Sequence, residues 1–288
     1  MAAQDPVIRA ESCGEITFLR MARRFLGRPL YWTGAYLVDG VLIDCGPPAT
    51  WRELLSALEG QRLEGLIVTH HHEDHMGAAA ALLARRQLRP QVHPLGVPLL
   101  ERGFVQELYR RFAWGRPPKV LAEPLGNEAV TRHLRFQVVH TPGHSPDHVC
   151  LFEAERGWLF TGDLFLAEKL RYLRSDEDVS RLIESLDAVG RLPARQVFCA
   201  HRGPLEDGPA SLRRKADGLR SLRERILDLL AQGLPEAEVA RRAVGPEGFL
   251  TWFSRGRFSA RNFVRAVAVH LTNENHKSTK DTKTEDAT

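Results

Sequence analysis

The stretch that decides the fold is Thr69-His-His-His-Glu-Asp-His75, which places four of the chain's twelve histidines within six positions. It follows an apolar run that begins at Leu63 and precedes a run of strong helix formers from Ala78 to Arg86. A cluster between a buried strand and a helix lies at the carboxyl edge of a sheet, where α/β proteins place their sites. A surface histidine cluster or a fragment of an expression tag would not follow a buried strand and interleave with Glu73 and Asp74. Imidazole and carboxylate together are ligands suited to zinc, iron or manganese.

Alternating strand and helix signals surround this cluster and indicate an α/β layered protein. Upstream, Tyr36 to Asp44 consists of two short apolar runs around Asp39-Gly40, a dipeptide favoured in type I′ hairpin turns. Residues 49–60 then carry apolar side chains at helical spacing. Downstream, strands are predicted at 91–94, 134–139, 149–152, 158–160 and 196–200, with a helix at 176–189 and a helical insertion at 99–119. Two βα halves of similar build are therefore expected.

Three further ligand candidates each stand just beyond one of the later apolar runs. His144 lies in Thr141-Pro-Gly-His-Ser, Asp163 in Thr161-Gly-Asp, and His201 in Ala200-His-Arg-Gly. Taken singly, such a residue is more often part of a turn. Four ligand-bearing segments in this order, counting the histidine cluster, together predict a binuclear metal site.

These motifs resemble those of the metallo-β-lactamase superfamily, whose HxHxDH signature is matched by His70-x-His72-x-Asp74-His75. The similarity covers roughly residues 30–205 and implies a four-layer αββα sandwich with the site along one edge of its two sheets. It also implies the roles of seven metal ligands: His70, His72 and His144 for one ion, Asp74, His75 and His201 for the second, and Asp163 bridging both. Asp44, in Leu-Ile-Asp-Cys-Gly46, matches the early Asp-x-Gly motif, whose aspartate orients metal ligands.

The cofactors expected from this set are two divalent metal ions, with zinc as the first choice and iron or manganese as alternatives. His72 stands where the oxygen-reducing diiron branch of the superfamily carries a carboxylate, which argues against that branch. Arg202 departs from the common Gly-His-Gly form of the last motif, and we expect it to crowd or charge the rim of the site.

A metal-dependent hydrolase is the function that this chemistry favours. Two cations lower the pKa of a bridging water from about 16 toward about 7, which yields a hydroxide nucleophile. Asp74 is the candidate catalytic residue, because as ligand and hydrogen-bond acceptor it could align that hydroxide. Our first hypothesis is cleavage of an ester, thioester or lactone of a small acyl compound. The alternatives are a phosphodiesterase or nuclease with the same binuclear site and a non-catalytic metal-binding sensor.

The chain is expected to divide into a catalytic domain at 1–210, a helical module at 211–271 and a disordered tail at 272–288. A helical segment after the metal-binding core resembles the arrangement in glyoxalase II-like thioesterases, although no copy of their glutathione-binding residues is found. The module carries 12 Lys/Arg against 6 Asp/Glu, which suits an anionic small-molecule substrate or a solvated helical surface. Aromatic side chains of the insertion and Leu164-Phe165-Leu166 are expected either to wall an apolar pocket or to pack in the core.

Bulk properties exclude several other classes of protein. The net charge of +4 is too small to demand a nucleic acid partner, and no apolar run is long enough for a membrane span or a signal peptide. We therefore expect a cytoplasmic protein with neither nucleic acid nor membrane partners. The four cysteines stand singly, so they are predicted to be reduced core residues. The sequence leaves the oligomeric state undefined.

Overall fold

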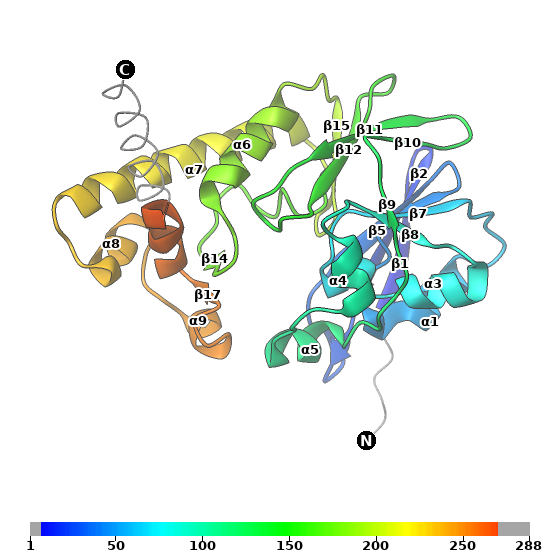
Figure 1. Ribbon diagram of the computed structural model, residues 1–288, viewed down its shortest axis with the longest axis horizontal. Coiled ribbons are helices and arrows are strands. Elements are labelled where there is room, and N and C mark those ends of the chain that lie inside the picture. Colours follow the sequence, from blue (N-terminus) through cyan, green and yellow to red (C-terminus); the bar gives the residue numbers. More distant parts are fainter. Residues whose placement is uncertain (1–6, 270–288) are drawn as a thin grey trace, which may run out of the picture.

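Two β-sheets packed face to face, with helices on both outer faces, make up most of the structure, a computed structural model that describes residues 7–269 (Figure 1). The first sheet has the order β1 (Val7–Cys13), β2 (Ile16–Ala22), β5 (Thr33–Val38), β6 (Val41–Ile43), β7 (Gly65–Val68), β8 (Pro90–Val92), β9 (Glu123–Pro124). The second has the order β10 (Glu128–Val130), β11 (Arg135–His140), β12 (Val149–Glu153), β13 (Trp158–Phe160), β15 (Gln196–Cys199), β16 (Gly203–Leu205). Two short ladders join β3 (Arg24–Phe25) to β4 (Arg28–Pro29) and β14 (Leu173–Arg174) to β17 (Phe258–Ser259).

The helices fall into a group on the first sheet, an insertion and a C-terminal group. The first group comprises the 3-10 turn η1 (Pro48–Thr50), α1 (Trp51–Ala57), α2 (Glu73–Met76) and α3 (Ala79–Arg86). The insertion contains α4 (Val97–Arg102) and α5 (Leu108–Trp114). The C-terminal group contains α6 (Val179–Gly190), α7 (Gly208–Ala231), α8 (Glu236–Ala243) and α9 (Phe249–Phe253), and residues 261–269 are also helical.

Three separate apolar clusters show that the layers are helix, sheet, sheet and helix. Leu54 of α1 and Leu82 of α3 pack with Leu66 of β7 on the outer face of the first sheet. A second cluster, made by both sheets, fills the space between them. On the outer face of the second sheet, α6 and α7 bury their apolar stripes against β12, β13 and β15. The predicted αββα sandwich with a C-terminal helical extension is therefore confirmed.

Most predicted elements lie where the sequence placed them. The hairpin turn at Asp39-Gly40 has φ values of 44° and 77°, as a type I′ turn requires. The strand predicted at 158–160 has those bounds. The strands β1 and β2 were not predicted, because charged residues interrupt their apolar pattern and β1 lies at the edge of the sheet with mostly exposed or half-exposed side chains. All four cysteines are free, and three of them are buried, as expected.

The C-terminal helices share a core with the second sheet. Helix α7 begins at Gly208, and its Leu212 and Leu219 pack in the same cluster as Val197 of β15 and Phe263 near the end of the described chain. The division of the chain at 210/211 stays a prediction, and the predicted tail at 272–288 lies outside the described residues. None of the helices in residues 7–269 combines the length and apolar composition needed to cross a bilayer.

Candidate metal centre

The seven predicted ligands meet at one edge of the sandwich, although they come from both sheets. The segment from His70 to His75 follows β7, and β7 runs parallel to β6, which ends just before Asp44. In the second sheet, Asp163 follows β13 and His201 follows the parallel strand β15, while His144 lies between β11 and β12. Since the carboxyl ends of parallel strands lie at the same edge, both sheets deliver their polar loops to one place. All seven side chains are buried.

The ligand atoms form two groups that Asp163 connects. His70, His72 and His144 make one group, and Asp74, His75, Asp163 and His201 make the other; within each group the ligand atoms lie within 4.8 Å of one another. Asp163 Oδ2 is 3.3 Å from His144 Nε2 in the first group. Asp163 Oδ1 is 3.2 Å from His75 Nε2 and 3.1 Å from His201 Nε2. One carboxylate therefore faces both groups, as a ligand bridging two ions would.

The outward ring nitrogens of these histidines are held by other residues. His75 Nδ1 lies 2.8 Å from Asp44 Oδ2, and His144 Nδ1 lies 2.6 Å from Glu177 Oε1. His201 Nδ1 lies 2.6 Å from the carbonyl oxygen of Trp32. Because carboxylate and carbonyl oxygens only accept, each Nδ1 carries a proton, and each Nε2 faces the site, where it offers a lone pair when the imidazole is neutral. Such partners orient metal ligands in other proteins as well.

Several buried atoms at the centre lack a hydrogen-bond partner. Within the described part of the chain, these include His70 Nε2, His75 Nε2 and Asp163 Oδ1. A buried polar atom without a partner costs about 1–3 kcal/mol, so a cluster of three requires an explanation. The donor set of imidazoles and carboxylates fits divalent ions such as zinc, iron or manganese, and coordination would satisfy all three atoms.

Electrostatics differ between the two groups. Burial lowers the pKa of His70 and His72, and neighbouring cationic groups lower it further, so these imidazoles are neutral. Burial also acts to lower the pKa of His75 and His201, but the neighbouring carboxylates, Asp163 foremost, together outweigh burial and raise both pKa values. The same two histidines hold the pKa of Asp163 well below its usual value despite burial. A divalent cation would supply the positive charge that the second group otherwise obtains by protonation.

Residues around the centre also make contacts that the sequence analysis did not predict. Glu73 is fully buried and forms a bidentate ion pair with Arg110 of α5, with Nε–Oε1 and Nη2–Oε2 distances of 2.5 and 3.0 Å. No periodicity marks such a long-range pair. His148 accepts a hydrogen bond of 3.0 Å from the backbone N–H of Asp163. His71 belongs to neither ligand group, and its Nδ1 lies 2.8 Å from Asp147 Oδ1.

Aromatic residues of the insertion and the segment after Asp163 separate into two classes. Leu164 and Phe165 are buried in the core with α6 and α7. Trp114 is also buried, whereas Phe112 is 42% exposed. Leu164 and Phe165 therefore pack in the core, which was one of the two expected alternatives. Phe112 lies at the surface. Arg202 is exposed at the rim, where its charge acts on Tyr31.

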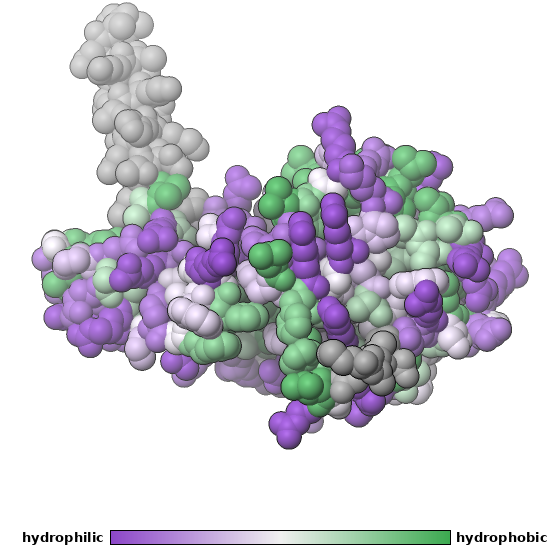
Figure 2. Space-filling model, turned by 90° about the horizontal axis from the view of Figure 1, so that it is seen from below, coloured by the Kyte–Doolittle hydropathy of each residue, from purple (hydrophilic) through white to green (hydrophobic). Residues whose placement is uncertain are grey.

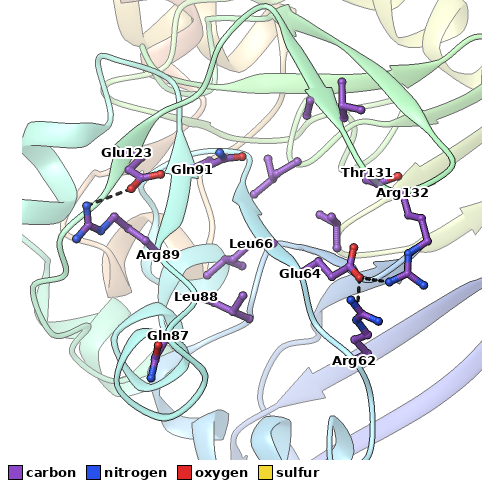
Figure 3. Close-up of a pocket in the computed structure, with 15 residues that line it drawn as sticks. Arg62, Glu64, Leu66, Gln87, Leu88, Arg89, Gln91, Glu123, Thr131 and Arg132 are labelled. Carbon is purple, nitrogen blue, oxygen red and sulfur yellow. Dashed lines mark hydrogen bonds and ion pairs between the residues drawn. The ribbon is translucent and has the colours of Figure 1, made fainter.

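A pocket of about 700 Å³ lies near the opposite, amino ends of β7 and β8 (Figure 3). In Figure 3, Arg62 and Arg132 both point to Glu64, and Arg89 pairs with Glu123. Each of these arginines is thus already paired with a carboxylate, and the pocket contains none of the seven ligands. The chemistry of this protein is concentrated at the other edge of the sheets.

Comparison with known proteins agrees with this geometry. The family model described as the Metallo-beta-lactamase superfamily matches residues 35–201. The chain is 30% identical over 180 residues to a hydroxyacylglutathione hydrolase of Legionella pneumophila (strain Lens), covering 61% of this chain and 63% of that protein. It is 33% identical over 175 residues to a hydroxyacylglutathione hydrolase of Albidiferax ferrireducens, covering 58% and 59%. The matched part thus spans less than two thirds of these curated relatives.

Solved structures with the same fold include proteins with and without a similar C-terminal region. A metallo-beta-lactamase family protein from Thermus thermophilus aligns over 91% of this chain and 94% of its own, with a TM-score of 0.65 and 21% identity. The protein TTHA1623, solved in a di-iron-bound form, aligns over 64% of this chain and 94% of its own, with a TM-score of 0.52 and 32% identity. The family match, which includes six of the seven ligands within its span and ends on the seventh, His201, leads to one conclusion. The chain belongs to the metallo-beta-lactamase superfamily.

Proposed function

We propose that the seven buried residues bind two divalent metal ions and that the protein hydrolyses a thioester or ester of a small acyl compound. His70, His72 and His144 would hold one ion, and Asp74, His75 and His201 the other, with Asp163 shared. Two ions bound in this way supply an acidified water nucleophile and polarise the carbonyl oxygen of the substrate. The position of Asp163, with one oxygen toward each group, is the observation that carries the proposal.

The protein's own residues would orient the reaction. Asp74 Oδ2 lies 3.5 Å from His201 Nε2, and its other oxygen lies 3.8 Å from Arg110 Nη2. Asp74 therefore has a contact at each carboxylate oxygen. This suits a residue that accepts a proton from the attacking water and keeps the lone pair of the water oxygen directed at the carbonyl carbon. We assign Asp74 the catalytic role for this reason.

A thioester is the first substrate class to test, because the curated relatives at 30–33% identity are hydroxyacylglutathione hydrolases. Those names describe the relatives, and the thiol carrier of this protein's substrate is left open. Zinc stays the first candidate for the metal, with iron and manganese as alternatives, and TTHA1623 was solved with two irons. An anionic small molecule suits the basic C-terminal segment, and the expected cytoplasmic location stays a prediction.

The experiment that tests the proposal compares wild type, Asp74→Ala and Asp74→Asn, each loaded separately with zinc, iron and manganese. Hydrolysis of thioester, ester, lactone and phosphodiester substrates is measured for every preparation. The proposal expects wild type to cleave the acyl substrates and Asp74→Ala to lose the activity by more than about 10²-fold, beyond the range of residues that only support a ligand. Cleavage of phosphodiesters alone would show that the protein is a phosphodiesterase and not a thioesterase or esterase. Inactivity of all metal forms on every substrate would support a non-catalytic metal-binding sensor.

A further inference from the structure

A groove of about 510 Å³ lies between helix α5 of the insertion and helix α9 of the C-terminal segment. Its walls are formed by two neighbouring sets of side chains, which are Glu107, Leu108, Tyr109 and Phe112 on one side and Phe253, Ser254, Arg255 and Arg257 on the other. Figure 1 shows α5 and α9 facing each other at the lower edge of the molecule. The volume lies within the range of about 300–1,000 Å³ that is common for small-molecule sites.

Several large apolar side chains of the groove are exposed to solvent. Leu108 is 72% exposed, and Phe112 and Phe253 are 42% and 41% exposed. Figure 2, which views the molecule from the side of α5 and α9, shows apolar areas over both of these elements. Neighbouring exposed apolar residues of this kind often mark a ligand-binding groove.

The inner wall of the groove is connected to the metal centre. Tyr109 packs its ring against Phe253 and Phe258, with centroid distances of 6.1 and 6.2 Å. Its neighbour in the chain, Arg110, pairs with Glu73 and reaches to 3.8 Å from Asp74 Oδ1. Behind Phe258, the strand partner Arg174 donates a hydrogen bond of 3.0 Å to the carbonyl oxygen of His144. Arg110 therefore lies between the groove lining and Asp74, and Phe258 and Arg174 lie between the lining and His144.

A few polar groups accompany the apolar walls of the groove. The hydroxyl oxygen of Tyr109 is inaccessible to solvent and has no hydrogen-bond partner among residues 7–269. Burial raises the pKa of Tyr109 to about 12, so the hydroxyl is a donor at neutral pH. Two exposed arginines also line the groove: Arg257 Nε lies 3.4 Å from Glu107 Oε1, whereas Arg255 forms no ion pair with any described residue.

We propose that this groove binds the straight apolar chain of an acyl substrate, so that the protein prefers medium or long acyl groups over acetyl. The inference rests on the proposed hydrolase function and adds the class of acyl group. The apolar walls would cover the chain, while the carbonyl end of the acyl group would lie at the proposed metal centre, where hydrolysis takes place. Because burial of each methylene contributes about 0.8 kcal/mol, kcat/KM is expected to rise up to about fourfold per added methylene until the groove is filled.

The test uses the full metal-loaded chain with acetyl, hexanoyl and decanoyl thioesters of one thiol. Leu108→Gln changes the groove at an exposed position, so it should leave folding intact, and Leu121→Gln is the matched control at a leucine that is 58% exposed outside the groove. We expect Leu108→Gln to lower kcat/KM for the decanoyl thioester by about fivefold or more and to change that for the acetyl thioester less than twofold. Leu121→Gln should change neither value. A wild type that shows no chain-length preference, or an equal loss with both thioesters, would overturn the groove assignment.

A direct binding measurement separates failure of the groove from failure of the hydrolase function. Titration calorimetry with decanoate, which undergoes no reaction, is carried out on wild type, Leu108→Gln and Phe253→Ala. Binding that weakens at least about fivefold in both groove variants supports the groove even if no thioester is cleaved. Absence of decanoate binding to the wild type rules the groove out even if acetyl thioesters are cleaved. Binding only to lipid vesicles that contain the same acyl chains would assign the apolar surface to a membrane instead.

Discussion

The two halves of the sandwich contribute to the proposed metal centre in different ways. In the first half, four of the ligands lie within the segment His70–His75, so one loop after β7 positions them all. In the second half, His144, Asp163 and His201 come from three loops that are up to 57 positions apart in the sequence. Ligands on one compact loop can share the same anchors, whereas three separate loops each need an anchor of their own.

The observed contacts agree with this difference. The first loop is fastened by Asp44, which contacts both His75 and Thr69, and by the buried pair of Glu73 with Arg110. In the second half, Glu177 holds His144 and the carbonyl oxygen of Trp32 holds His201. Beside Asp163, the buried Lys215 of α7 donates to the carbonyl oxygen of Leu164 at 2.6 Å. The helices that follow the second sheet are thus part of the metal centre's support.

Loss of the anchor of the first loop should give the largest effect on stability. Arg110→Met leaves Glu73 buried and unpaired, which typically costs about 3–5 kcal/mol of unfolding free energy. The control Arg89→Met removes an exposed ion pair with Glu123 and should cost less than about 1 kcal/mol. Denaturant unfolding of the metal-loaded variants measures both values. Equal costs for the two variants would mean that the Glu73 pair does not anchor the loop.

In the second half, the effect of the buried Lys215 on the free energy of unfolding should depend on pH. Burial lowers the pKa of Lys215 from 10.5 to about 8. Between these two values the unfolded chain binds the proton more tightly than the fold does, so stability rises with pH across that window. At about 1.4 kcal/mol per pKa unit, the rise is about 3 kcal/mol. Unfolding of wild type and Lys215→Met between pH 7 and 11 measures it, and parallel curves for the two proteins would show that Lys215 is not the cause.

Substitution of the two carboxylates that contact ligand histidines should have smaller effects, each on the affinity for one metal ion. Asp44→Asn should weaken the ion held by His75, and Glu177→Gln should weaken the ion held by His144, each by about 10–100-fold. Asn is a suitable replacement because Asp44 has a φ of 61°, a region that Asn tolerates. Competition with a chromophoric chelator resolves the two binding steps. If both variants weaken the same step, the two groups do not act as separate sites.

The same difference explains how much the sequence could predict. His70, His72, Asp74 and His75 could be assigned as metal ligands because they form one closely spaced motif between a predicted strand and a predicted helix. The later ligands were predicted from their positions after apolar runs, which is a weaker signal that the order of the runs reinforced. Pairs such as Glu73 with Arg110 join residues 37 positions apart, and no local pattern records them. The groove between α5 and α9 depends on two segments separated by more than 100 residues, so only the three-dimensional arrangement could show it.

The shared position of Asp163 is the central claim, and metal content tests it most directly. Elemental mass spectrometry on wild type, Asp163→Ala and the control Asp147→Asn, whose partner His71 lies outside both ligand groups, gives the number of ions per chain. We expect about two ions in wild type and in Asp147→Asn and fewer than one in Asp163→Ala, because both groups lose a ligand. Two ions retained in Asp163→Ala, or none in wild type under metal-replete conditions, would contradict the two-metal centre.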